Sequence, residues 1–123
     1  MFQLFSRPFI ESERFGEARK LVAELISAQT SPEVFVEITK AIERADLVPL
    51  LETITAPTLV VGGRFDIMTP IDVGPSGAGG RIIAERIPGA ELVILDAGHT
   101  FLIEQPEESC RVIAEFLSGL SAA

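Results

Sequence analysis

Cysteine, histidine and the larger aromatic residues are scarce in this chain of 123 residues, which has one cysteine, one histidine and neither tryptophan nor tyrosine. A single cysteine cannot form an internal disulfide, so nothing in the composition points to an oxidising compartment. One histidine and one cysteine also argue against a structural zinc site. No apolar run approaches the roughly 18 residues that span a membrane, and the N-terminus lacks the basic stretch of a signal peptide. We therefore predict a cytoplasmic protein without a metal site.

Basic residues are also few, because 10 lysines and arginines stand against 18 acidic residues, which gives a formal net charge of −8. A negative chain repels phosphate backbones and anionic lipid, so we expect neither nucleic-acid nor membrane partners. The plain interpretation is that the carboxylates solvate helix faces. Hydrophobic residues make up 47% of the chain, which is enough for the core of one small domain.

The first half of the chain has helical periodicity. A helix is predicted over residues 12–29 with Ser12 as its N-cap, and a second helix is predicted from Ser31 and Pro32, a cap followed by proline at the first position. Asp46 is expected to cap a short further helix. The apolar residues that precede the first helix show no periodicity, and we expect them to pack against a preceding segment. The expected apolar stripe of the second helix is Phe35, Ile38, Ile42 and Ala45.

The second half alternates apolar runs with helical segments. Residues 57–61 and 91–95 predict strands that are buried on both faces, as in parallel sheets, with a helix over residues 80–86 between them. This order predicts a right-handed βαβ unit. A last helix is expected from Pro106 to about Gly119. Its predicted apolar face is Cys110, Ile113, Phe116 or Leu117, and Leu120, so that Cys110 is interpreted as an inert core thiol.

Two parallel strands do not form a stable sheet by themselves. Within the predicted strands, residues 59–61 and 92–95 lack the charges or proline that protect an exposed edge from pairing with other chains. The sequence therefore predicts either the end of a larger α/β domain or a subunit whose sheet is completed by a partner or by self-association.

Asp66 and His99 follow the two predicted strands. Because the carboxyl ends of adjacent parallel strands meet at one edge of the sheet, we expect these two side chains to lie together. A carboxylate that accepts a hydrogen bond from Nδ1 of a histidine leaves the other ring nitrogen free to act as a base. Each residue also has a simpler interpretation, since an aspartate after a strand is commonly a turn residue and a lone histidine is often structural.

Several stretches, in order, resemble the C-terminal part of the α/β-hydrolases. The resemblance covers residues 54–118 and implies an α/β fold in which residues 54–123 form the C-terminal β-α-β-α part of the core. Residues 1–53 fit more loosely, as a cap remnant and a helix that returns to the sheet. The stretches are PTLVVGGRFD at 57–66 with Thr69 and Pro70 after it, IPGAEL at 87–92, AGH at 97–99, EQPE at 104–107 and AEFL at 114–117.

The resemblance implies a triad in the chain order nucleophile, acid, histidine, with Asp66 as the acid and His99 as the histidine. No serine upstream of Asp66 lies between glycines, as the nucleophile of these enzymes does. Ser76 follows the acid, has no strand directly before it and fits the pattern poorly. We therefore expect the nucleophile to lie outside this chain, and the chain alone to be inactive.

The resemblance also implies a small-molecule substrate with an ester, lactone or C–C bond, and no cofactor. Phe65, Met68, Phe101 and Leu102 flank the two predicted catalytic positions and are predicted to line an apolar substrate pocket. Glu104 has two interpretations. It either favours the dipole at the start of the last helix, which we prefer, or it supports the histidine loop. The alternative to an enzyme is a non-catalytic partial domain that binds a partner through its open sheet edge.

Overall fold

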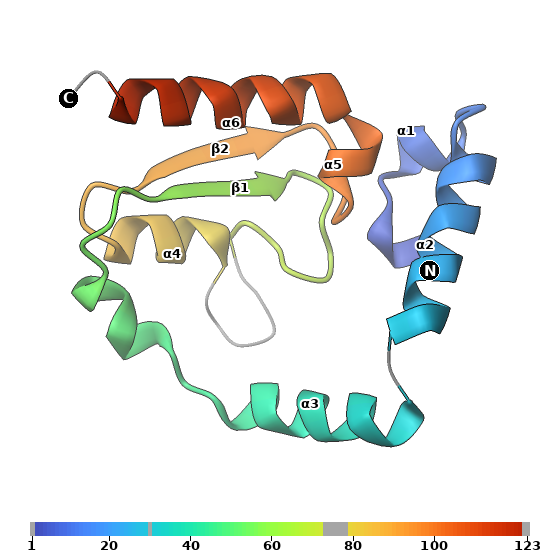
Figure 1. The fold of residues 1–123 in the computed structure, drawn as a ribbon, viewed down its shortest axis with the longest axis horizontal. Helices are drawn as coiled ribbons and strands as arrows, with labels where there is room; N and C mark the ends of the chain where they lie inside the picture. Colours follow the sequence, from blue (N-terminus) through green and yellow to red (C-terminus); the bar gives the residue numbers. More distant parts are fainter. Residues whose placement is uncertain (1, 30, 73–78, 122–123) are drawn as a thin grey trace.

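The computed structural model describes residues 2–29, 31–72 and 79–121 of the chain. Short and long helices come first and are followed by a strand, a helix, a second strand and two further helices (Figure 1). The elements are the 3₁₀ helix η1 (Phe2–Leu4), α1 (Arg7–Ile10), α2 (Phe15–Gln29), α3 (Pro32–Arg44), the 3₁₀ helix η2 (Val48–Thr53), β1 (Leu59–Gly63), α4 (Gly80–Arg86), β2 (Glu91–Leu95), α5 (Phe101–Glu104) and α6 (Pro106–Leu120).

The predicted parallel βαβ unit is confirmed. β1 and β2 pair in parallel with Leu59 opposite Glu91 and Gly63 opposite Leu95, and α4 and α6 cover opposite faces of this pair (Figure 1). Cover on both faces explains why the strands are apolar runs without alternation. Among the described residues β1 hydrogen-bonds to no strand other than β2, so its outer edge is open.

The carboxyl ends of the two strands approach each other very closely. The N–H of Arg64 donates to the carbonyl of Leu95 at 2.8 Å, and the N–H of Phe65 donates to that of Ala97 at 3.0 Å. A side chain at Gly63 would collide with the carbonyl oxygens of Ala97 and Gly98. Glycine at this position therefore brings the loop after β1 against the loop after β2.

The N-terminal segment differs from the prediction. Ser6, not Ser12, caps a helix, the short α1, and α2 begins at Phe15. The hydroxyl of Ser12 instead donates to the carbonyl of Phe9. The expectation that the apolar start needs a preceding segment is wrong for Phe5 and Phe9, because both are buried within the chain. Their cluster comprises Phe5, Phe9, Ala18 and Val22, with Phe5 stacked on Phe9 and meeting Phe15 edge to face.

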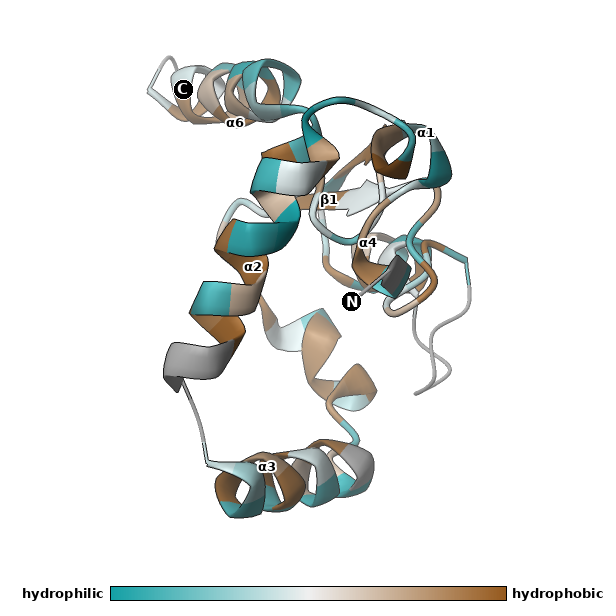
Figure 2. Ribbon diagram, turned by 90° about the vertical axis from the view of Figure 1, so that its right-hand side faces the viewer, coloured by the Kyte–Doolittle hydropathy of each residue, from teal (hydrophilic) through white to brown (hydrophobic). Residues whose placement is uncertain are grey.

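The predicted helix after Ser31 is confirmed as α3, with the Ser31 hydroxyl accepting from the N–H of Val34. Its expected apolar stripe is exposed: Phe35 is 65% and Ile42 is 67% accessible. Figure 2 shows that α3 stands apart from the sheet while carrying hydrophobic residues. Asp46 does accept from the N–H of Val48, but the helix that follows is the 3₁₀ helix η2.

The last helix begins at Pro106 as predicted, but a different side of it is buried. Ser109 and Val112 face the core, and Val112 packs with Leu95 and Ala97 against β2. Cys110 is exposed, so its interpretation as a core thiol is wrong. The helix has two apolar stripes, and its sequence alone does not tell which one meets the sheet. No helix in the described part of the chain is long and apolar enough to cross a membrane.

Candidate active site

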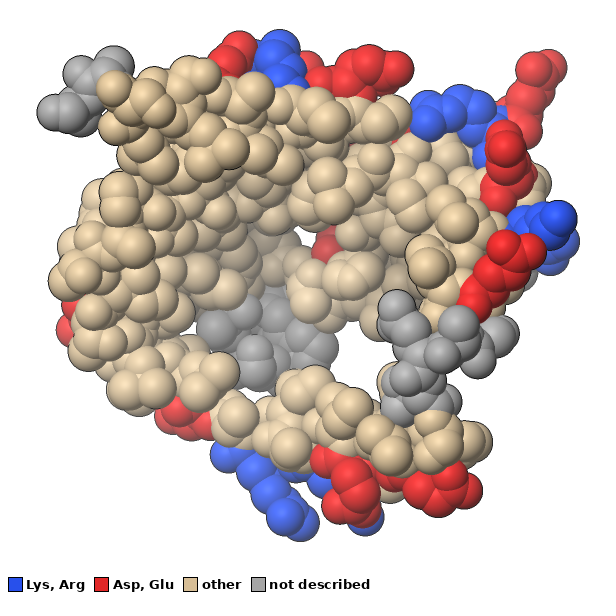
Figure 3. Space-filling model, in the orientation of Figure 1, with Lys and Arg blue, Asp and Glu red and all other residues tan. Residues whose placement is uncertain are grey.

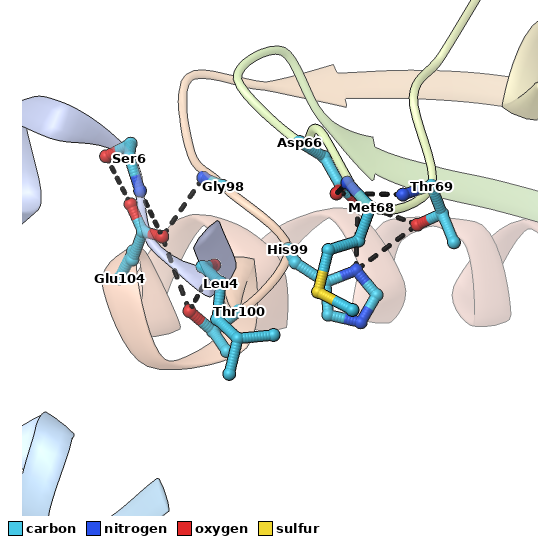
Figure 4. A network of polar contacts seen from close by, with 9 residues as sticks. All are labelled: Leu4, Ser6, Asp66, Met68, Thr69, Gly98, His99, Thr100 and Glu104. Atoms are coloured by element: carbon cyan, nitrogen blue, oxygen red, sulfur yellow. Dashed lines mark hydrogen bonds and ion pairs between the residues drawn. The ribbon is translucent and has the colours of Figure 1, made fainter. Parts of the chain in front are cut away.

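The two loops at the carboxyl ends of β1 and β2 bring Asp66 and His99 into contact, as predicted. Nδ1 of His99 lies 2.9 Å from Oδ2 of Asp66 (Figure 4). The Asp66 residue is buried, whereas the imidazole of His99 is 38% accessible. A buried carboxylate thus meets one edge of a ring that remains open to solvent.

Asp66 is a turn residue as well as a partner of His99. Its Oδ1 accepts from the N–H groups of Met68 at 2.8 Å and Thr69 at 3.0 Å, which is an Asx-turn. Its Oδ2 accepts from the Thr69 hydroxyl at 2.7 Å and faces His99. The two interpretations that the sequence left open are therefore compatible, because each uses a different oxygen.

Burial of the Asp66 carboxyl raises its pKa, but hydrogen bonds from the N–H and hydroxyl of Thr69, from His99 and from the N–H of Met68 outweigh this effect. The net result is a pKa below the usual value for aspartate. Asp66 is therefore ionised at neutral pH, and its Oδ2 can accept a hydrogen bond from Nδ1–H of His99. The Thr69 hydroxyl lies 3.2 Å from the same ring nitrogen, and sequence reasoning named Thr69 in the family resemblance without giving its hydroxyl a role.

In the described part of the chain both polar contacts of the imidazole are made at Nδ1. Figure 4 shows the opposite edge of the ring pointing away from Asp66. With Nδ1–H donating to the carboxylate, Nε2 carries a lone pair and can accept a proton from a nucleophile. This arrangement is chemically competent for general base and then general acid work.

Glu104 does not play the part that we preferred from the sequence. It is the last residue of α5, it is 5% accessible, and its carboxylate accepts hydrogen bonds rather than facing solvent near a helix start. Its donors are the N–H groups of Gly98 and Ser6, both at 3.0 Å, and the Ser6 hydroxyl, and the Thr100 hydroxyl lies 3.4 Å away. The alternative interpretation, support of the histidine loop, fits these contacts. Sequence reasoning gave no role to Thr100 or to Ser6, and Ser6 carries no local signal of a contact 98 positions away.

The four residues predicted to line a substrate pocket differ in how far they are exposed. Phe65, Met68 and Leu102 are exposed, at 46%, 43% and 55%. Phe101 is half-buried and packs against the core cluster of Leu95, Ala97 and Val112. Their role in binding stays a prediction. Ser76 lies outside the described residues.

Charged side chains lie mainly around the margin of the face that Figure 3 shows, and the surface next to its central hollow is largely uncharged.

A groove of about 460 Å³ lies elsewhere, against β1, β2 and α6, and has Leu59, Val93 and Phe116 among its lining residues. No group of three side chains that could hold a metal ion occurs among the described residues.

No family model matches the chain. Over 80 residues it is 34% identical to 3-oxoadipate enol-lactonase 2 of Acinetobacter baylyi, a match covering 65% of this chain and 28% of that protein. Among solved structures, the enol-lactonase from Burkholderia xenovorans LB400 matches with a TM-score of 0.70 at 28% identity, over 94% of this chain and 41% of that one. An α/β hydrolase enzyme from a Medee basin deep-sea metagenome library matches with a TM-score of 0.71 at 24% identity and the same coverage.

The described residues form an α/β arrangement in which an aspartate and a histidine lie together at the ends of adjacent parallel strands. The chain belongs to the α/β-hydrolase fold and forms the C-terminal portion of it. Its matches to these relatives extend over 28% to 41% of their own lengths.

Proposed function

We propose that this chain supplies the acid and the histidine of an α/β-hydrolase that cleaves an ester or lactone bond in a small molecule. The observation that carries the proposal is the contact between Asp66 and His99, in which a buried, hydrogen-bonded carboxylate meets Nδ1 of a partly exposed imidazole. The similarity to two enol-lactonases supports the choice of bond.

In the proposed reaction, Nε2 of His99 removes the proton from a nucleophile as the nucleophile attacks the substrate carbonyl. The resulting imidazolium is stabilised by Asp66 and then gives its proton to the leaving oxygen. The Thr69 hydroxyl and the two N–H groups of the Asx-turn hold the carboxylate in place for this step. The nucleophile and the donors that stabilise the oxyanion are proposed to come from a segment or chain outside these residues, so the chain alone is expected to be inactive.

The helical residues 1–53 are proposed to be part of a cap over the site together with the helix that returns to the sheet. Exposure of the apolar stripe of α3 supports this proposal, because a helix with a free apolar face needs a partner or a ligand. In Figure 3 the charged side chains of α3 lie on its outer side, away from the hollow. Phe65, Met68, Phe101 and Leu102 remain the proposed contacts of the substrate.

A second candidate function is a non-catalytic module that binds a partner or a second copy through the open edge of β1. It is favoured by the two-stranded sheet seen in the described residues. It predicts that the purified chain forms oligomers or captures a β-strand, and that substitution of His99 has no effect on this association.

Two measurements distinguish the candidates. The first is the intact mass of the native protein that contains the peptide of residues 87–111. A mass near 13.3 kDa favours a separate partner chain, and a mass roughly double that or more favours one longer hydrolase. The second is ester hydrolysis by the purified 123-residue chain. His99-dependent hydrolysis by this chain would overturn the proposal that its nucleophile lies elsewhere.

A further inference from the structure

The Glu104 carboxylate joins the loop that carries His99 to the N-terminal segment, across 98 positions of sequence. Oε1 accepts from the N–H of Ser6 and from the N–H of Gly98, each at 3.0 Å, and Oε2 accepts from the Ser6 hydroxyl. Oε1 also lies 3.4 Å from the Thr100 hydroxyl (Figure 4). The carboxylate therefore bonds Gly98, the residue before His99, and lies close to the hydroxyl of Thr100, the residue after it.

Other contacts tie the same two segments together. The N–H and hydroxyl of Thr100 both donate to the carbonyl of Leu4 at 3.0 Å. A side chain at Gly98 would come within 3 Å of the backbone of Phe5 and Ser6 and of the Glu104 carboxylate. The absence of a side chain at Gly98 lets the two backbones approach this closely.

Arg14, which directly precedes α2, adds further contacts to this attachment. Its guanidinium donates to the carbonyls of Ile103 at 2.9 Å and Glu104 at 3.0 Å, and it lies over the ring of Phe9. The end of α5 is thus held at two points. The Arg14 side chain binds its main-chain carbonyls, and the Glu104 side chain binds Ser6.

Burying a carboxylate costs free energy, because the water that it loses must be replaced by hydrogen bonds within the protein. The Glu104 carboxylate accepts a hydrogen bond from the main-chain N–H of Gly98, which belongs to the Ala97–Gly98 peptide, one peptide before the one that leads into His99. Removing the acceptor leaves that N–H buried without a partner and frees the loop to move. The tolerance for such movement is small, since the Nδ1 contact of His99 depends on a 2.9 Å distance to Asp66.

We propose that Glu104 is a positioning residue for His99: together with Ser6 it fixes the loop of residues 98–100 so that the imidazole keeps its Nδ1–H bond to Asp66 and presents Nε2 as a base. The value of this positioning for catalysis rests on the proposed function, but the positioning itself can be observed without substrate or nucleophile.

The test uses the fact that His99 is the only histidine, so ¹⁵N-histidine labelling of the full chain reports this ring alone. The ¹⁵N shifts give the ratio of the Nδ1–H to the Nε2–H tautomer, and a downfield Nδ1–H proton reports the bond to Asp66. Glu104→Ala is expected to lower the tautomer ratio by roughly fivefold and to weaken the downfield proton signal.

Glu104→Gln is the conservative variant. Its carbonyl oxygen can take the place of Oε1 and accept from Ser6 and Gly98, and its amide can donate to the Ser6 hydroxyl, which then accepts. The glutamine variant is therefore expected to restore the tautomer ratio to near the unsubstituted value. Ile87→Ala is the stability control, because Ile87 is 3% accessible and lies before β2, at the end of that strand away from His99.

An unchanged tautomer ratio in Glu104→Ala, or an equal change in Ile87→Ala, would overturn the proposal. If Glu104→Ala does not fold, Ser6→Ala is read in its place: a lower ratio supports the proposal and an unchanged ratio overturns it. Failure of the proposed function looks different, because the native protein would then hydrolyse no ester or lactone while the tautomer ratio of the unsubstituted chain still fell in Glu104→Ala.

Discussion

Replacing Asp66 by asparagine tests the two oxygens of this residue separately. Asparagine has the same shape, and with its carbonyl toward Met68 and Thr69 it keeps the Asx-turn. The amide group then takes the place of Oδ2 and presents N–H donors to Nδ1 of His99 and to the Thr69 hydroxyl. Nδ1 must accept rather than donate, which moves the ring proton to Nε2 and removes the base.

The expected magnitudes follow from this geometry. One charge-assisted bond is exchanged while the turn is kept, so the free energy of unfolding should fall by about 1–3 kcal/mol. In a protein that supplies the nucleophile, kcat for ester hydrolysis should fall by roughly 10⁴-fold, as for the same exchange in a Ser-His-Asp triad, with little change in KM.

Urea unfolding of the chain and steady-state kinetics of the native protein measure the two quantities. Asp72→Asn is the matched control, since Asp72 pairs with Arg81 on the surface and should contribute less than about 1 kcal/mol. A folded Asp66→Asn protein whose kcat stays within about tenfold of the unsubstituted value would refute the assignment of Asp66 as the partner of a catalytic histidine.

Three further results are expected. Folding lowers the pKa of Asp66, so its contribution to stability is complete above the unfolded value of about 3.9 and is lost as the pH falls through the lower folded value. The difference in the free energy of unfolding between the unsubstituted chain and Asp66→Asn should therefore shrink below about pH 4 in urea titrations. A difference that stays constant with pH would contradict the lowered pKa. Gly98→Ala should destabilise the chain by about 1–3 kcal/mol, because its methyl group meets the backbone of Phe5 and Ser6; thermal unfolding that is unaltered by the substitution would show that this contact is loose. Cys110 should react with iodoacetamide in the native chain, since it is exposed, and protection until the chain is unfolded would show that another surface covers it.

The strands, the crossover helix and the Asp66–His99 contact could all be predicted from the sequence. Continuous apolar runs identify buried parallel strands, and parallel pairing then dictates that the residues after each strand share one edge. The prediction of Asp66 and His99 as neighbours thus depended on local patterns and one topological rule, and the observed 2.9 Å contact confirms it.

Features that depend on contacts between distant segments were predicted poorly. Phe5 and Phe9 were expected to pack against a preceding segment, yet α2 covers them. Glu104 looked like a residue near a helix start, because its partner Ser6 lies 98 positions away and no periodicity links them. In α6, the side that contains Val112 and the side that contains Cys110 could each face the core. Packing against the sheet buries the side of Val112, and the helix sequence alone does not show this.

Hydrolysis of an ester or lactone by the native protein that contains residues 87–111, with and without His99→Ala, tests the central claim most directly. We predict that the unsubstituted protein hydrolyses such a substrate and that His99→Ala lowers kcat by at least about 10³-fold in a protein that remains folded. Hydrolysis that is unchanged by His99→Ala, or absent from the unsubstituted protein, would contradict the account.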